Sequence, residues 1–223
     1  MKSSKTNSGS KAPTAFDHIF GGEIQEVITC PKCKTASSKV TPFVDISLDI
    51  KKAKTIEEAL VEYFKVKHVG MLDDEETWYT CGKCEVKVYA TCQSFLEVLP
   101  PVLCLHLQRF DVIGGQATFK IKKPVKLCEI LTLMYKNGLK VNYKLRSIIN
   151  HIGNSPYSGH YTAIGECGES QFFHFDDNLV RKSSIPEVLN SVSYVVMFEM
   201  TPSSWSALFK PSNGLSNIVT GLF

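Results

Sequence analysis

The stretch Cys30-Pro31-Lys32-Cys33 does most to decide the fold, together with its counterpart Cys81-Gly82-Lys83-Cys84. The two-residue spacing lets both thiolates of a pair reach one metal from a tight turn, and two such turns side by side complete a tetrahedral site. Lys32, Lys34 and Lys83 are placed to offset the negative charge that four thiolates leave on zinc. We therefore predict one zinc ion held by Cys30, Cys33, Cys81 and Cys84.

A redox function is the alternative interpretation of these cysteine pairs. A redox pair is expected singly, at the start of a helix in a βαβ unit, and neither pair has that context. Because sulfur occupies all four positions of the predicted site, no position stays open for a catalytic water. The predicted zinc is structural.

The composition is that of a globular protein, with 223 residues of which 43% are hydrophobic. The formal charge of +3 is spread without a basic block, which argues against nucleic acid and anionic membranes as partners. The start of the chain has no secretory signal, and the longest apolar stretch, residues 98–107, is far shorter than the ~20 residues that span a bilayer. We expect a soluble intracellular protein, cytoplasmic or nuclear, whose eight cysteines form no disulfide framework.

The periodicity of apolar residues predicts an α+β fold with mostly antiparallel strands. Residues 43–50 alternate as a half-buried strand, with Val44, Ile46, Leu48 and Ile50 on one face. Thr55 then opens a helix of about three turns, with a capping box completed by Glu58. A second short helix is predicted at 186–189, a flexible leader at 1–14 and a loosely ordered tail at 201–223. Further strands are predicted at 78–80, 86–94, 102–110, 143–152, 160–165, 171–175 and 193–200.

The segment Tyr157-Ser158-Gly159-His160-Tyr161, followed by Phe175-Asp176-Asp177, contains two members of a catalytic triad. A histidine that serves a thiol as general base needs a carboxylate on its other ring nitrogen, to fix the tautomer and stabilise the imidazolium. Gly159 is the type of residue found where a substrate backbone passes close by. Taken alone the segment also fits a packed core histidine, so the catalytic interpretation needs wider support.

That support comes from the order of several segments along residues 15–200. They are Ile19-Phe20-Gly21-Gly22, the two cysteine pairs, the run from Leu99 to Phe110, Ser158-Gly159-His160-Tyr161, Phe175-Asp176-Asp177 and the strand Tyr194-Val195-Val196-Met197-Phe198. This combination is similar to the ubiquitin-specific protease family of cysteine deubiquitinases. The resemblance implies a papain-like cysteine protease hand, with zinc-bearing fingers at about 25–97 and a palm at about 98–200. It also implies ubiquitin and ubiquitinated proteins as partners.

The resemblance gives each site residue a role. It makes His160 the general base, Asp176 the residue that orients it, and Asp177 the polar neighbour that assists near the oxyanion. His106 matches a strand position that is not catalytic, and we expect it to be packed and hydrogen-bonded. Cys104 is expected on the same face of that strand, as a core thiol.

The chain departs from the family pattern at its beginning. The family's box with the nucleophilic cysteine and the helical thumb has no counterpart here, so we expect this chain alone to be inactive. Cys167, seven residues from His160, lies in a Gly-rich turn without a helix dipole or nearby cation to activate its thiol, and is a poor substitute nucleophile.

Two other functions remain open from the sequence. One is a non-catalytic, zinc-stabilised module that binds ubiquitin. The other is a zinc-ribbon nucleic-acid binder, which the absence of a Lys/Arg stripe disfavours. The acidic run at 73–76 fits a solvated loop better than a contact with a basic patch of ubiquitin.

Overall fold

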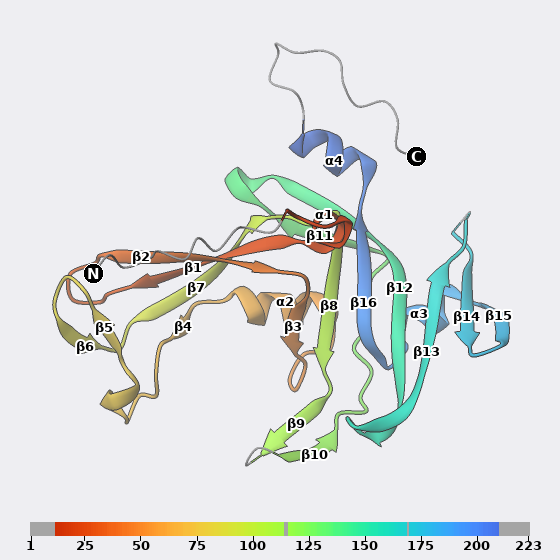
Figure 1. Ribbon diagram of the computed structural model, residues 1–223, viewed down its shortest axis with the longest axis horizontal. Coiled ribbons are helices and arrows are strands. Elements are labelled where there is room, and N and C mark those ends of the chain that lie inside the picture. Colours follow the sequence, from red (N-terminus) through yellow and green to blue (C-terminus); the bar gives the residue numbers. More distant parts are fainter. Residues whose placement is uncertain (1–11, 114–115, 169, 210–223) are drawn as a thin grey trace, which may run out of the picture.

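Two β-sheets make up most of the computed structural model, which describes residues 12–113, 116–168 and 170–209 (Figure 1). A four-stranded sheet has the order β2-β1-β7-β4, and an eight-stranded sheet has the order β15-β14-β13-β12-β16-β8-β3, with β11 added beside β12. The first sheet extends to one side of the second, with the cysteine turns near its far end (Figure 1). Only β3 and β8 pair in parallel, so the described residues form the antiparallel α+β fold that the sequence predicts.

The four-stranded sheet and the small hairpin beside it carry both cysteine pairs. Strands β1 and β2 form a hairpin whose turn contains the first pair. Strands β5 and β6 form a hairpin in which Cys81 ends β5 and Cys84 lies in the turn. The bounds are β1 Gly22–Thr29, β2 Ala36–Phe43, β4 Lys67–His68, β5 Tyr79–Cys81, β6 Val86–Val88 and β7 Thr91–Val98.

The eight-stranded sheet is built around β12, the longest strand. A bulge between its pairs Leu145 with Phe198 and Ser147 with Met197 lets this strand bend along β16. The bounds are β3 Ile46–Asp49, β8 Val102–Gln108, β11 Ile130–Met134, β12 Lys140–Ser155, β13 Ser158–Glu166, β14 Phe172–Asp176, β15 Leu179–Ser183 and β16 Ser193–Met200. A separate two-stranded hairpin consists of β9 Phe110–Ile113 and β10 Gln116–Lys120.

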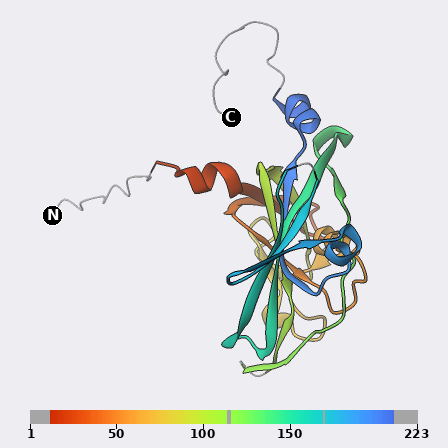
Figure 2. The ribbon, with the colours of Figure 1, turned by 90° about the vertical axis from the view of Figure 1, so that its right-hand side faces the viewer.

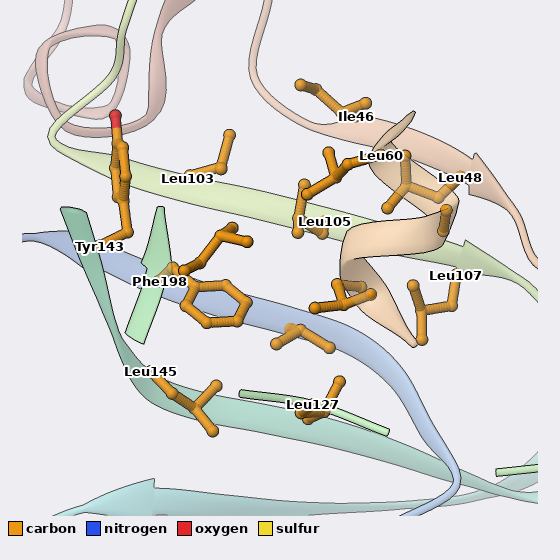
Figure 3. Close-up of a cluster of buried hydrophobic side chains, with 14 of the residues drawn as sticks. Ile46, Leu48, Leu60, Leu103, Leu105, Leu107, Leu127, Tyr143, Leu145 and Phe198 are labelled. Atoms are coloured by element: carbon orange, nitrogen blue, oxygen red, sulfur yellow. The ribbon is translucent and has the colours of Figure 1, made fainter. Parts of the chain in front are cut away.

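The main core lies on one face of the eight-stranded sheet (Figure 3). Leu103, Leu105 and Leu107 alternate along β8 and are fully buried, because every second side chain of a strand points to the same face. They pack beside Phe198 and against the helix that carries Leu60. The position of the strand is therefore set by its apolar face, and the intervening residues Cys104 and His106 lie on the opposite face.

Short helices connect and flank the sheets. Thr55 caps α2 by accepting a hydrogen bond from the Glu58 amide, but the Glu58 carboxylate accepts from the Lys54 amide, so the predicted capping box is replaced by a contact one residue earlier. Figure 2 shows α1 extending away from the sheets, opposite to the side that carries α3. The bounds are α1 Ala15–Phe20, α2 Ile56–Phe64, α3 Ile185–Leu189, α4 Pro202–Leu208, and the 3-10 turns η1 Glu75–Thr77 and η2 Lys136–Gly138. Among the described helices, none has the length and apolar character that crossing a membrane requires.

Several sequence predictions need correction. Val44 does not continue the strand of Ile46 and Leu48; the chain bends at 44–45 and Val44 is exposed. The strand predicted at 86–94 divides into β6 and β7, with a break at 89–90. The tail predicted as loosely ordered begins with α4, which Thr201 caps and Pro202 starts. Residues 1–11 of the predicted leader and 210–223 of the tail lie outside the described part of the chain.

Candidate functional site

His160 and Asp176 lie side by side on the neighbouring strands β13 and β14. His160 stands near the start of β13 and Asp176 at the end of β14, and the hairpin between them closes through Cys167, whose amide donates to the Gln171 carbonyl. Nε2 of His160 is 2.5 Å from Oδ1 of Asp176. The structure thus brings the two residues together across sixteen positions of sequence.

The contact fixes the tautomer of His160. An ionised carboxylate only accepts hydrogen bonds, so Nε2 carries the proton and the lone pair is on Nδ1. The hydrogen bond to Asp176 raises the pKa of His160 above its usual value, with a further contribution from the charge of Asp177. Since the side chains of His160 and Asp176 are 43% and 38% exposed, the pair is open to a reacting molecule. Nδ1 is therefore a basic atom whose protonated form is stabilised in place.

Asp177 completes the cluster from the turn that follows β14. Its backbone is left-handed, with φ +50°, in the tight connection between the paired residues Asp176 and Leu179. The ligand atoms of His160, Asp176 and Asp177 all lie within 4.8 Å of one another. Asp177 adds negative charge near the imidazole, while Asp176 alone makes the hydrogen bond to it.

The space beside Gly159 is occupied by the ring of His151. A Cβ placed on Gly159 would come within 2.1 Å of Nε2 of His151 and 2.6 Å of the Ile152 carbonyl oxygen. We expected a close approach at Gly159, but by a substrate backbone. The structure shows instead that a buried side chain of β12 makes this approach.

Sequence reasoning missed His151 and its partner Lys120. His151 is 4% exposed, and Lys120 of β10 reaches it with its ammonium group 3.0 Å from Nδ1. The signal in the sequence was a histidine at an alternating position of a strand, close to a glycine-rich turn. It was overlooked because the register that places His151 opposite Tyr161 becomes visible only in the structure.

The four predicted zinc ligands converge at the end of the four-stranded sheet. Sγ of Cys30 is 4.0 Å from Sγ of Cys84, and Sγ of Cys33 is 3.7 Å from Sγ of Cys81. A tetrahedron with Zn–S bonds of about 2.3 Å has sulfur atoms about 3.8 Å apart, so the spacing fits the ion. All four sulfur atoms lie within 4.8 Å of one another, and the cluster can hold a metal.

Both cysteine turns have the same backbone geometry. In the first, the Lys34 amide donates to the Cys30 carbonyl at 3.0 Å, and in the second the Glu85 amide donates to the Cys81 carbonyl at 2.8 Å. The residue after each second cysteine is left-handed, with φ 59° for Lys34 and 53° for Glu85. Such a turn aims both thiols of a pair to one side, which explains why two separate segments build one site.

The four cysteines outside the cluster have different environments. Cys167 follows the far end of β13, seven residues along an extended strand and thus about 23 Å distant. Burial raises the pKa of Cys104 to about 11 and that of Cys128 to about 12, so both thiols stay protonated. Cys92 belongs to the four-stranded sheet. In the described residues the ring of His160 is hydrogen-bonded to Asp176 and to none of these four thiols.

His106 is packed and hydrogen-bonded, as its strand position predicts. Its Nδ1 lies 3.0 Å from Oγ of Ser47, and its ring meets Tyr194 edge to face at 4.8 Å. Burial lowers its pKa, which keeps the imidazole neutral. Cys104 shares its half-buried face of β8.

The acidic run at 73–76 forms an ordered loop. Asp74 caps the short η1 helix by accepting from the Glu76 amide, and the Glu76 carboxylate pairs with Lys87 of β6. The Lys87 contact lowers the pKa of Glu76. These contacts account for two of the four acidic residues within the loop itself.

Comparisons with known proteins agree with this architecture. Residues 1–198 match the family described as ubiquitin carboxyl-terminal hydrolase. Ubiquitin carboxyl-terminal hydrolase 36 of Drosophila pseudoobscura pseudoobscura is 34% identical over 218 residues, which cover 92% of this chain and 19% of the relative. The protein of the same name in Drosophila melanogaster is 34% identical over 193 residues, covering 85% of this chain and 18% of the relative.

Solved structures show the same fold. The yeast SAGA DUB module superimposes with a TM-score of 0.78 at 28% identity, over 86% of this chain and 43% of the matched chain. A SAGA DUB module bound to monoubiquitin gives a TM-score of 0.74 at 29% identity, over 83% of this chain and 42% of the other. The chain spans about a fifth of the curated relatives and less than half of the solved chains. With most of its length matched to the family, the chain belongs to the ubiquitin carboxyl-terminal hydrolases, as one of the ubiquitin-specific proteases that its sequence resembles.

Proposed function

We propose that this chain is the fingers and palm, at about 25–97 and 98–200, of a thiol-dependent deubiquitinase that binds ubiquitin and ubiquitinated proteins. The observation that carries the proposal is the hydrogen bond between His160 and Asp176, which leaves Nδ1 as a free basic atom at an exposed edge. The matched structures include modules bound to monoubiquitin and to ubiquitin aldehyde. Those titles support ubiquitin as the partner.

The proposed chemistry assigns one step to each residue of the cluster. Nδ1 of His160 takes the proton of a cysteine thiol, and the thiolate attacks the carbonyl carbon of the ubiquitin C-terminal glycine. His160 then gives its proton to the leaving amine, and water, activated by the same nitrogen, hydrolyses the thioester. Asp176 holds the ring and stabilises its charged form, while Asp177 assists near the oxyanion.

We assign none of the eight cysteines of this chain as the nucleophile. We assign four cysteines to the metal cluster. Burial raises the pKa of Cys92, Cys104 and Cys128, and Cys167 follows the end of β13 that lies away from His160. We therefore propose that the 223-residue polypeptide alone binds ubiquitin without hydrolysing its conjugates. Binding without hydrolysis is also what a non-catalytic ubiquitin-binding module would show, so that alternative remains a second candidate function.

Zinc is the ion that best suits the four-cysteine cluster. Thiolates favour zinc among the common structural ions, and the sulfur spacing matches its tetrahedral geometry. Cys30, Cys33, Cys81 and Cys84 would hold it, and the ion would join the two hairpins. A reducing compartment, cytoplasm or nucleus, is where four such thiols persist.

Titration of isotope-labelled ubiquitin with the zinc-loaded polypeptide tests the proposed function. We expect saturable changes in the NMR signals of ubiquitin, and the same affinity for the His160→Ala variant, since contacts with the body of ubiquitin do not need the imidazole. Unchanged ubiquitin spectra at millimolar polypeptide would refute the proposal. If a Cys81→Ser variant that has lost its metal still bound ubiquitin with the same affinity, the proposed role of the zinc-bearing fingers in binding would be wrong.

A further inference from the structure

His151 fills the inside of the turn that leads into His160. Its ring lies 4.8 Å from Tyr161 and 5.5 Å from Phe110, between centroids, and its side chain is almost completely buried. The regular pairing of β12 with β13 ends at Ile152 with His160, where the register shifts. Beyond the irregularity only Ser155 and Ser158 pair, so His160 is the first residue of β13 in the regular ladder, and its position depends on what supports the turn.

Lys120 fixes the state of the His151 ring. The ammonium of Lys120 lies 3.0 Å from Nδ1 of His151 and donates to the His151 carbonyl at 2.5 Å. Because an ammonium only donates, Nδ1 is the acceptor and the proton of the neutral ring is on Nε2. Lys120 belongs to β10, so this contact also connects the β9–β10 hairpin to the turn, and Figure 1 shows the two together at the lower end of the molecule.

Two glycines let the turn close on the ring. Gly159 has no room for a Cβ because Nε2 of His151 would lie 2.1 Å away. Gly153, at φ +143°, faces Cε1 of His151 and the Ser158 carbonyl at 3.3 Å and 3.0 Å from the place of its missing Cβ. The ring is therefore enclosed by the backbone on both sides of the turn.

The enclosed Nε2 makes no hydrogen bond of good geometry, and the Ser158 carbonyl only partly opposes the lowering of the His151 pKa that burial and the charge of Lys120 cause. A buried donor with so weak an acceptor is uncommon in folded proteins, so packing rather than hydrogen bonding decides where this nitrogen lies. Here the ring is held by Lys120 at one nitrogen, and its other nitrogen rests against Gly159, the residue directly before His160. Because Gly159 directly precedes His160, a shift of the His151 ring moves the backbone that carries His160.

We propose that His151 is a positioning residue, held by Lys120, which sets the backbone of Gly159 and so places the imidazole of His160 against Asp176. The proposal rests on the proposed function of His160, and deepens it. Its consequence is that the hydrogen bond from His160 to Asp176 needs a residue that touches neither of them in any described contact. Hydrogen bonds weaken steeply with distance and angle, so a small shift of the turn is sufficient.

NMR titration of the His160 ring in the zinc-loaded polypeptide tests the proposal. His151→Phe keeps a flat ring of similar size and removes the contact with Lys120. We expect the pKa of His160, raised in the unsubstituted protein, to fall toward its ordinary value of about 6.5 in this variant. Lys120→Arg keeps a donor and should leave the titration close to that of the unsubstituted protein, whereas Lys120→Met should lower the pKa of His160.

His106→Phe is the matched control. His106 is a half-buried histidine of the same sheet, and its ring packs on Tyr194 as the buried ring of His151 does, but it lies on β8 and not in the β12–β13 turn. We expect this variant to leave the titration of His160 unchanged. Equal shifts in His106→Phe and His151→Phe would show general loosening of the sheet and overturn the proposal.

The remaining outcomes are also decisive. An unchanged pKa of His160 in a folded His151→Phe protein overturns the positioning role and leaves the proposed function standing. If His151→Phe does not fold, Lys120→Met decides, and an unchanged titration there overturns the proposal. An ordinary pKa of His160 in the unsubstituted protein would count against the proposed function itself.

Discussion

Nε2 of His160 lies 2.5 Å from Oδ1 of Asp176, and this contact exists because a short hairpin places the start of β13 beside the end of β14. The pair stands at the rim of the sheet, where both side chains stay partly exposed. Its strength is open to direct measurement, because the pKa of the imidazole reports on the neighbouring carboxylate.

Replacing Asp176 by Asn should lower the pKa of His160. The hydrogen bond to Asp176 is the largest cause of the raised pKa, and Asp177 contributes only through its charge. Asp177→Asn is therefore the control and should lower the pKa less. NMR titration of the His160 ring measures its pKa in both variants. A larger decrease in Asp177→Asn than in Asp176→Asn would mean that Asp177, and not Asp176, orients the ring.

The same pair should make folding stability depend on pH. Because folding raises the pKa of His160, its contribution is fully present below the unfolded value of about 6.5 and is lost as the pH rises through the folded pKa. Urea unfolding of the unsubstituted and His160→Gln proteins should therefore differ most on the acid side of this window. A difference that grows with rising pH would contradict the assignment.

Removing one cysteine of the cluster should release the metal. Cys81→Ser is expected to reduce zinc from one ion per chain to none and to loosen the small core of Cys30, Cys81, Val88 and Ala90. Cys167→Ser is the control, since this exposed thiol lies outside the cluster. Elemental analysis with thermal unfolding gives both readouts, and zinc retained in Cys81→Ser would refute the site.

Arg109, the residue between β8 and β9, should contribute strongly to stability. It is fully buried, and it donates to the carbonyls of Ser193, Ile121 and Lys123 at 2.5, 3.0 and 2.9 Å. Arg109→Met leaves these acceptors without a charged donor, and we expect a loss of about 3–5 kcal/mol in the free energy of unfolding.

Arg146→Met is the comparison for that measurement. Arg146 is 42% exposed and pairs with Glu166 and Glu199, so its loss should cost about 1 kcal/mol or less. Chemical denaturation compares the two variants. Equal losses of unfolding free energy in the two variants would contradict the claim that the buried guanidinium holds β16 to the segment after β10.

The strands in which apolar and polar residues alternate regularly were predicted from the sequence. β8 alternates Leu103, Leu105 and Leu107 toward the core, and β16 was predicted with its observed bounds. The hairpin of β1 and β2 was not predicted, because β2 is exposed along nearly its whole length and carries no alternating signal. The four-cysteine cluster was predictable because its ligand spacing is local to each turn.

The environment of His160 was less accessible to sequence reasoning. The Asp176 partner followed from the motif, but the ring of His151 inside the turn depends on the register of β12 with β13 and on a lysine from another hairpin. Gly159 was expected to make room for a substrate and makes room for His151 instead. Contacts between distant segments carry no periodicity, so they emerge only from the three-dimensional fold.

Release of a fluorophore from the C-terminus of ubiquitin tests the central claim most directly, namely that the base and the ubiquitin-binding surface are present while the nucleophile is not. We predict that the 223-residue polypeptide, loaded with zinc and shown to bind ubiquitin, releases the fluorophore no faster than buffer, because a triad without its nucleophile loses covalent catalysis. Release above background that disappears in the His160→Ala variant would contradict the account, and Cys167→Ser would then identify or exclude the exposed thiol as its source.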